Sequence, residues 1–142
     1  MIRITVKNLQ KRIPFTRAIS GKIKQAVRRC FLSEKVKKPA EINLCLVTGR
    51  KIRMMNLKYF GKSAPTDVIA FDLGNRKDFI FADIIICADT AVSNARIYKK
   101  SPLQELYLYA IHGALHILGY RDKAVKQRKA MMDKADKLLA GL

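Results

Sequence analysis

The sequence predicts one α+β domain spanning residues 1–142, with a small sheet of about four strands covered by about five helices. Its 142 residues are the usual size of one compact domain, and 49% of them are hydrophobic, which is enough for a core. Strand-like alternation and helical periodicity follow one another without a linker, an internal repeat or a low-complexity tract. The expected order is strand, helix, strand, helix, two strands and then three helices.

The first half of this pattern contains two strands, each followed by a helix. Residues 2–7 alternate apolar and polar side chains, which predicts a strand. Residues 18–30 carry apolar side chains at three- and four-residue steps, the pattern of an amphipathic helix. Residues 41–47 are rich in Ile, Leu and Val and predict a second strand, and residues 50–59 are expected to form the next helix.

Two strands and the loops around them are expected next. Residues 60–65 predict a loop, residues 68–71 a short strand and residues 74–78 a polar turn. Residues 79–88 are apolar enough to form a central strand.

Three helices are expected to complete the chain. Thr90 is expected to cap the first helix, which runs to about residue 98. Ser101 and Pro102 have the residue types of an N-cap and a first helical position, and Gly119 is expected to end that second helix after residue 118. The third helix is expected over about residues 123–139.

The charge of the chain indicates a polyanionic partner. Lys and Arg total 29 against 11 Asp and Glu, a net charge of +18, and residues 1–39 hold 12 basic residues and one acidic residue. Nucleic acid is the default partner for such a chain, and an anionic membrane surface is the rival. The polar face of the first helix carries cations that predict either a phosphate-binding wall or a solvated surface: Lys22, Lys24, Arg28 and Arg29.

Other sequence features favour a cytoplasmic protein without a membrane span. No apolar run is long enough to cross a bilayer as a helix, and the first residues lack the apolar region of a secretory signal. The three cysteines are widely separated and have neither metal-binding nor disulfide spacing, so they are expected to be buried thiols: Cys30, Cys45 and Cys87.

A candidate metal site follows from the two histidines of the chain. His112 and His116 lie four residues apart in a predicted helix, so they share one face and can bind one divalent ion from the same side. Gly113 occupies the position of the glutamate base in HExxH peptidases, which argues against a peptidase. Gly119 can turn the chain back, so that Asp122 faces both imidazoles. Two histidines and one carboxylate are an accepted ligand set for catalytic zinc, so we expect one zinc ion per chain, although such histidine pairs also occur without a metal.

Four stretches of the chain resemble one protein family. HGALHILGY at residues 112–120 resembles the signature HGxLHLxGYDH of the YbeY family, bacterial endoribonucleases that mature ribosomal RNA. PTDVIAF at residues 65–71 is similar to the family's PTDVLSF, and NLKYFGK at residues 56–62 to its NxxYRGK. FADIIIC at residues 81–87 is similar to the family's GDIVIS strand, and the resemblance covers about residues 42–139.

The resemblance implies a fold, an activity and partners. The fold would have a four-stranded sheet and about five helices, with zinc in a cleft lined by positive charge. The activity would be hydrolytic cleavage of single-stranded RNA in 16S ribosomal RNA maturation and ribosome quality control, with the small ribosomal subunit as partner. His112 and His116 would be catalytic as well as metal ligands, and Lys62, which matches a family lysine, would hold the scissile phosphate. A solvated loop lysine is the alternative interpretation of Lys62.

Two positions depart from the family pattern and leave a second function open. Asp122, preceded by Arg121 instead of an aspartate, stands where the family has its third histidine; a carboxylate there would weaken the site or favour a harder ion. Phe60 replaces a family arginine and cannot neutralise a phosphate, so we expect it to be buried, with base stacking as the alternative. The alternative function is a ribosome- or RNA-binding assembly factor with weak or no catalysis. A metallohydrolase of another class is the least favoured.

Two further carboxylates are expected to have structural roles. Asp67 is expected to make a local hydrogen bond before the short strand, and with Thr66 to shape the wall of the cleft. Asp83, inside the strongest predicted strand, is expected to pair with a buried backbone group or a cation.

Overall fold

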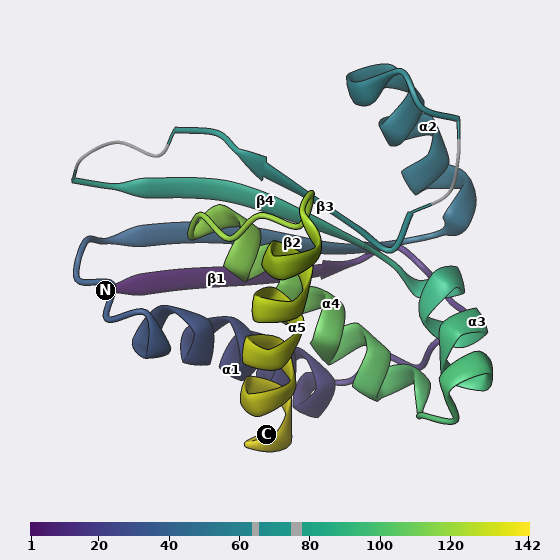
Figure 1. Ribbon diagram of the computed structural model, residues 1–142. Coiled ribbons are helices and arrows are strands. Elements are labelled where there is room, and N and C mark those ends of the chain that lie inside the picture. The colour runs from purple at the N-terminus through teal and green to yellow at the C-terminus, as the bar shows by residue number, and fades with distance from the viewer. Residues whose placement is uncertain (64–65, 75–77) are drawn as a thin grey trace.

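Four strands and five helices make up the part of the chain that the computed structural model describes, residues 1–63, 66–74 and 78–142 (Figure 1). The sheet has the order β1-β2-β4-β3, in which β1, β2 and β4 run parallel and β3 lies antiparallel at one edge. The α+β fold that the sequence predicts is therefore confirmed. In chain order the elements are β1 Ile2–Asn8, α1 Arg17–Ser33, β2 Ala40–Val47, α2 Gly49–Phe60, β3 Val68–Asp72, β4 Ile80–Cys87, α3 Ala88–Tyr98, α4 Pro102–Ile117 and α5 Val125–Ala140.

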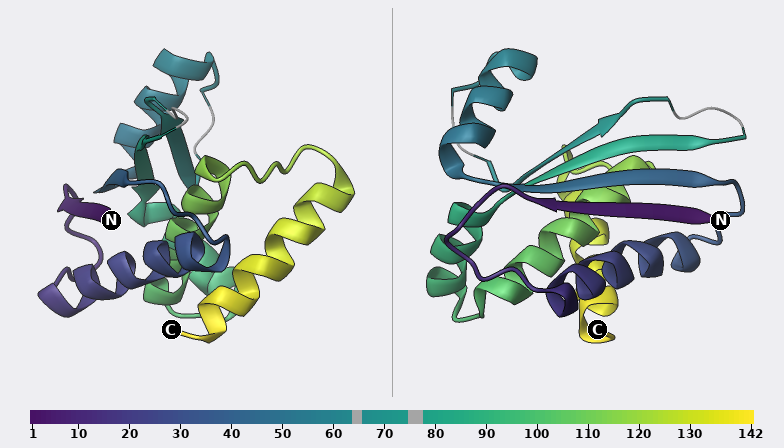
Figure 2. Two further views of the ribbon diagram at one scale, coloured as in Figure 1. Left: turned by 90° about the vertical axis from the view of Figure 1, so that its left-hand side faces the viewer. Right: turned by 180° about the vertical axis from the view of Figure 1, so that it is seen from behind.

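The main core lies between one face of the sheet and the helices α1 and α4, with α5 packed outside them (Figures 1 and 2). Residues 42 and 84 on the neighbouring strands β2 and β4 are both isoleucines that point into this core. Phe31 of α1 and Ile111 of α4 pack into the same core without solvent exposure. Burial of these side chains is the main force that fixes α4, and with it the histidines, against the sheet.

A smaller core on the opposite face of the sheet lies beneath α2. Ile52 of α2 packs there with Ile69 of β3 and Ile85 of β4. The N-terminus of α2 is held by Asp89 at the start of α3, whose carboxylate accepts the Gly49 N–H at 2.6 Å. The remainder of this face carries exposed or half-buried polar side chains: Arg3, Thr5, Lys7, Glu41, Asn43 and Asp83.

The N-termini of α3, α4 and α5 agree only in part with the predicted caps. Ser101 caps α4 as expected, and Gln104 completes a reciprocal capping box with it. The prediction that Thr90 caps α3 is wrong: β4 runs directly into α3, so the helix begins at Ala88 and the thiol of Cys87 lies 3.4 Å from the Thr90 N–H. The last helix begins at Val125, two residues later than expected.

The environments of Cys45 and Asp83 differ from those that the sequence predicts. Cys30 and Cys87 are buried and Cys45 is half-buried, and burial raises the pKa of the Cys30 thiol to about 12. Asp83 pairs with an amide, not with a backbone group or a cation, because Asn43 on the adjacent strand donates to its carboxylate at 3.3 Å. Residues 64 and 65 of the expected loop, the second of which begins the PTDVIAF stretch, and residues 75–77 of the expected turn lie outside the described residues. Within the described chain, no helix has the length and apolar character needed to cross a membrane.

Candidate metal centre and cleft

The two histidines lie one turn apart on α4 and face the N-terminal end of β3. Around them the helix is nearly all buried, which fixes the direction of both imidazoles. Gly113 allows this close approach: a Cβ atom there would lie only 2.6 Å from Cγ2 of Ile84 on β4. The helix presents the histidine pair from a rigid support, as the four-residue spacing predicts.

A tight turn after α4 brings Asp122 back to the histidines. Gly119 has a φ of +105°, and its N–H donates to the His116 carbonyl at 3.1 Å. The Tyr120 N–H donates to the Leu115 carbonyl at 3.0 Å, which completes a Schellman ending. The Asp122 carboxylate then lies 3.5 Å from Nε2 of His116.

The side chain of Tyr120 anchors the same turn to two other helices. It shares a hydrogen bond with the Glu34 carboxylate at the end of α1, which raises the pKa of Tyr120 to about 12. Glu34 in turn lies 3.9 Å from the ammonium group of Lys134 on α5. This contact holds the segment that carries Asp122 between α1 and α5.

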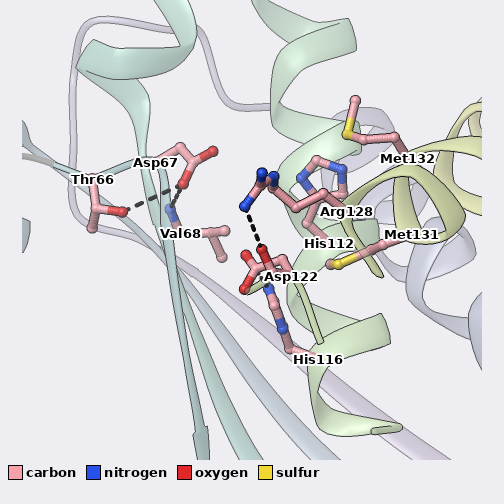
Figure 3. Close-up of a pocket in the computed structure, with 9 residues that line it drawn as sticks. All are labelled: Thr66, Asp67, Val68, His112, His116, Asp122, Arg128, Met131 and Met132. Atoms are coloured by element: carbon pink, nitrogen blue, oxygen red, sulfur yellow. Dashed lines mark hydrogen bonds and ion pairs between the residues drawn. The ribbon is translucent and has the colours of Figure 1, made fainter. Parts of the chain in front are cut away.

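The three predicted ligands share one cleft of about 280 Å³ (Figure 3). The cleft lies between the start of β3, α4 and the first turns of α5. Its lining comprises Thr66, Asp67, Val68, His112, His116, Asp122, Arg128, Met131 and Met132.

The two imidazoles have different surroundings. Nε2 of His112 is buried and has no hydrogen-bond partner among the described residues. Burial lowers the pKa of His112, and the nearby His116 adds to this effect while Asp67 opposes it, so the ring is held in the neutral form that binds metals. Nδ1 of His116 lies 3.1 Å from the Tyr120 carbonyl. A proton on that nitrogen would leave Nε2 of His116 free to bind an ion.

These observations fit a metal ion, although the side chains are not arranged as a finished site. Within the described ranges, no group of three or more His, Cys, Asp or Glu side chains is close enough to hold an ion. A buried nitrogen without a partner is costly, and a cation bound by His112 would satisfy it. The His116 tautomer and the Asp122 carboxylate supply the other two donors of the expected set.

Arg128 is a cleft residue that the sequence analysis missed. Its guanidinium donates to the carbonyls of Asp122 and Lys123 at 3.3 and 2.9 Å, and Figure 3 shows it between Asp67 and His112. An arginine has five N–H donors, so this anchoring leaves others for an anion. The only sequence signal was its place in the first turn of the helix after Asp122, which cannot be distinguished from the other surface cations of that helix.

The wall opposite the histidines is shaped by local hydrogen bonds. The Asp67 carboxylate accepts the Val68 N–H at 2.8 Å and lies 3.4 Å from the Thr66 hydroxyl, in line with the expected local role. The Thr90 hydroxyl donates to the Thr66 carbonyl at 3.3 Å. The start of α3 therefore fixes this wall from behind.

The other predicted site residues are not among the described residues that line the cleft. Lys62 is exposed in the segment after α2 and is not among the described residues that line the cleft. Lys24 and Arg28 lie on the outer side of α1. The Arg29 guanidinium lies against Gly141, about 20 Å along α5 from Arg128. Their roles as RNA-binding cations stay predictions.

Phe60 differs from its expected environment. The side chain is 50% exposed, not buried, because it lies in the last turn of α2, where the helix extends beyond the sheet. Its ring stacks on Phe71 of β3, with centroids 5.8 Å apart and an angle of 13° between the planes.

The protein is of the α+β class, with a mixed sheet and a histidine–carboxylate cleft beside the antiparallel edge strand of that sheet. Comparison with known proteins gives the family. The family described as endoribonuclease YbeY matches residues 5–142, so the chain belongs to that family. The resemblance found in the sequence is therefore confirmed.

Individual relatives agree with this assignment. Endoribonuclease YbeY of Pelotomaculum thermopropionicum is 31% identical, with 98% of this chain and 96% of the relative covered. Endoribonuclease YbeY of Bacillus velezensis is 35% identical, with 87% and 88% covered. The fold is similar to the solution structure of TM1509 from Thermotoga maritima, with a TM-score of 0.62, 27% identity and coverage of 98% of this chain and 87% of that one.

Proposed function

We propose that this endoribonuclease cleaves single-stranded RNA with the help of one zinc ion, and that it acts in 16S ribosomal RNA maturation and ribosome quality control on the small ribosomal subunit. The observation that carries the proposal is the partnerless, buried Nε2 of His112, which faces a cleft shared with His116 and Asp122. These three residues would hold the ion. When bound there, zinc would supply Lewis-acid activation of water and of the phosphate.

The residues of the chain would position the RNA for this reaction. The Arg128 guanidinium is held in place by two backbone carbonyls and is free to donate its remaining N–H groups to a phosphate oxygen. Because the scissile phosphate gains negative charge in the transition state, a fixed cation beside it lowers the barrier. Arg128 thus offers the positive charge that Phe60 cannot supply.

The metal part of the proposal is tested by elemental mass spectrometry of purified protein. We expect about one zinc per chain in the wild type, and its loss in His116→Ala and Asp122→Ala. Asp133→Ala removes an exposed carboxylate of α5 outside the cleft and serves as the matched control. Equal zinc content in the wild type and in Asp122→Ala would show that Asp122 is not a ligand.

The catalytic part is tested by cleavage of a single-stranded RNA substrate. His112→Ala and His116→Ala are expected to abolish cleavage, and Asp122→His, which restores the family residue, is expected to retain it. Cleavage that persists unchanged in both alanine variants would exclude the histidine pair from catalysis.

An RNA- or ribosome-binding assembly factor with weak catalysis is the second candidate. Two observations favour it: the three donors are not gathered as a finished site, and Phe60 is an exposed apolar ring. Salt-sensitive binding to RNA or to the small subunit, without metal-dependent cleavage, would select this function. The absence of RNA affinity at low salt would exclude it.

A further inference from the structure

Three aromatic side chains form a cluster on the face of β3 opposite the cleft. Tyr59 and Phe60 end α2, and Phe71 lies near the end of β3. The Phe60 ring is nearly parallel to Phe71, while Tyr59 meets Phe71 edge-on at 5.2 Å and 70°. These three residues are called the aromatic cluster below.

Two of the three rings of the aromatic cluster are about half exposed to solvent. Phe71 is half-buried and packs against the smaller core, so it forms the base of the cluster. Tyr59 and Phe60 are 55% and 50% exposed. Because Phe60 uses one face of its ring for Phe71, the other face is available to a planar ligand.

The charge around the cluster identifies the class of ligand. The helix α2 carries no acidic residue and exposes four cations. Lys58 adjoins the cluster, and Arg50, Lys51 and Arg53 lie about 9–15 Å away along the helix. The Lys58 ammonium lies 5.3 Å from the centre of the Tyr59 ring. Acidic groups are also near: Asp72 follows Phe71 and is exposed, and Asp83 pairs with β3 opposite Phe71 but is engaged by Asn43. Flat apolar rings beside a row of cations match a polyanion with planar bases.

The cluster and the cleft share the edge strand β3. Val68 borders the cleft, and Phe71 lies three residues further along, about 10 Å away, with its side chain on the other face. An extended single strand that crosses this edge would contact both. A double helix would offer no free base face for stacking.

We propose that the aromatic cluster is a stacking site for an unpaired base of the RNA strand whose phosphate lies in the cleft. The inference rests on the proposed function for the identity of the ligand as RNA. The base would stack on the outer face of Phe60, while cations of α2 contact the adjacent phosphates. Phe60 would then contribute to substrate binding through its ring, without any role for positive charge at that position.

The test measures binding of a short single-stranded oligoribonucleotide in the presence of a chelator, so that cleavage does not contribute. Phe60→Leu is expected to weaken binding by about five- to a hundredfold, the range of one aromatic–base stack, and Phe60→Trp to retain it. Tyr98→Leu, which changes an exposed tyrosine at the end of α3, is the matched control and should bind like the wild type. Quenching of 2-aminopurine in the oligonucleotide should accompany binding to the wild type and be lost in Phe60→Leu.

A second measurement uses only wild-type protein and does not depend on the folding of a variant. An oligonucleotide with the same phosphates but abasic sugars should bind more weakly than the normal one by a similar factor. Equal affinity for the two oligonucleotides, or equal affinity of Phe60→Leu and wild type, would overturn the proposal. Because these readouts are binding and fluorescence, they are independent of metal content and of cleavage, which test the proposed function.

Discussion

The imidazole of His116 is oriented by the same turn that supplies Asp122. Its Nδ1 lies near the Tyr120 carbonyl, and its Nε2 lies near the Asp122 carboxylate. Tyr120 is itself tied to α1 through Glu34. His116 and the turn that carries Asp122 are therefore oriented by neighbouring groups, while bringing these two side chains together with His112 is left to ion binding.

Arg128 gives a prediction that separates metal binding from phosphate binding. Arg128→Ala is expected to reduce kcat/KM for RNA cleavage on the order of 10- to 100-fold, because a fixed donor to the phosphate is lost. Arg128→Lys should recover part of the loss, since it keeps the charge without the planar fork. Zinc content should be unchanged in both variants. Loss of zinc in Arg128→Ala would instead show that Arg128 acts by holding the turn that carries Asp122.

Glu105 gives a prediction about pH and stability. It is buried in the first turns of α4, and burial raises the pKa of its carboxyl above the ordinary 4.5, although Lys100 and the Tyr109 hydroxyl oppose the shift. The folded chain therefore binds this proton more tightly than the unfolded chain, and the stability it contributes at low pH is lost as pH rises through the folded pKa.

We expect the free energy of unfolding of the wild type, relative to Glu105→Gln, to fall as pH rises above the ordinary carboxyl pKa of 4.5. Urea unfolding at several pH values measures this difference, with Glu41→Gln on the open face of the sheet as control. A difference that does not change with pH would contradict the prediction.

Among the elements, α4 has the tightest contact with the sheet, and two glycines allow a matched test. Gly113→Ala would place a Cβ atom against Ile84 and is expected to reduce stability by about 1–3 kcal/mol. Gly21→Ala in α1, where no atom lies within 4 Å of the added Cβ, is expected to raise stability by about 0.5–1 kcal/mol. Chemical denaturation of both variants provides the measurement. Equal stability of Gly113→Ala and wild type would show that β4 can move away from the helix.

The same elements show what the sequence could predict. Periodicity located the nine described elements within about three residues, because long apolar patterns follow directly from burial. The Gly119 turn and the position of Asp122 also followed from local rules. The cap of α3 was missed because β4 continues into that helix without a loop, so no turn residue marks the boundary.

Two features of the site could not be predicted because they depend on tertiary placement. Arg128 reaches the cleft only because α5 returns across α4 (Figure 1), and several surface cations of α5 have the same local sequence pattern. Phe60 is a large apolar side chain, which suggests burial, yet its helix extends past the sheet.

For the molecule as a whole, the net charge of +18 predicts a strong dependence of RNA affinity on salt. If the outer side of α1 contacts RNA, Lys24→Gln with Arg28→Gln should reduce the slope of log K against log salt by about 0.7 per cation for a long strand. A short oligonucleotide confined to the cleft should show no change, because Arg29 of the same face lies about 20 Å along α5 from Arg128. Equal slopes of the variant and the wild type on the long strand would remove α1 from the binding surface.

In the proposed scheme the two faces of the sheet have different roles. The face covered by α1 and α4 (Figure 2) carries the main core and the cleft. The other face carries the cations of β1 and the aromatic cluster at the end of α2. The edge strand β3 joins the two. Its register against β4 sets which of its side chains face the cleft and which face the aromatic cluster, so a one-residue slip would exchange the two sets.

The attachment of α2 has a consequence for local unfolding. This helix has only two buried side chains, Ile52 and Asn56, and its first turn is held by the Thr48 hydroxyl and the Asp89 carboxylate. Its amide hydrogens should therefore exchange with solvent at a lower free energy than those of α4, as an opening unit separate from the main core. If RNA stacks on the aromatic cluster, bound RNA should slow exchange in α2 more than in α4, which hydrogen–deuterium exchange can resolve. The least anchored helix of the fold would then become ordered by the substrate that it helps to hold.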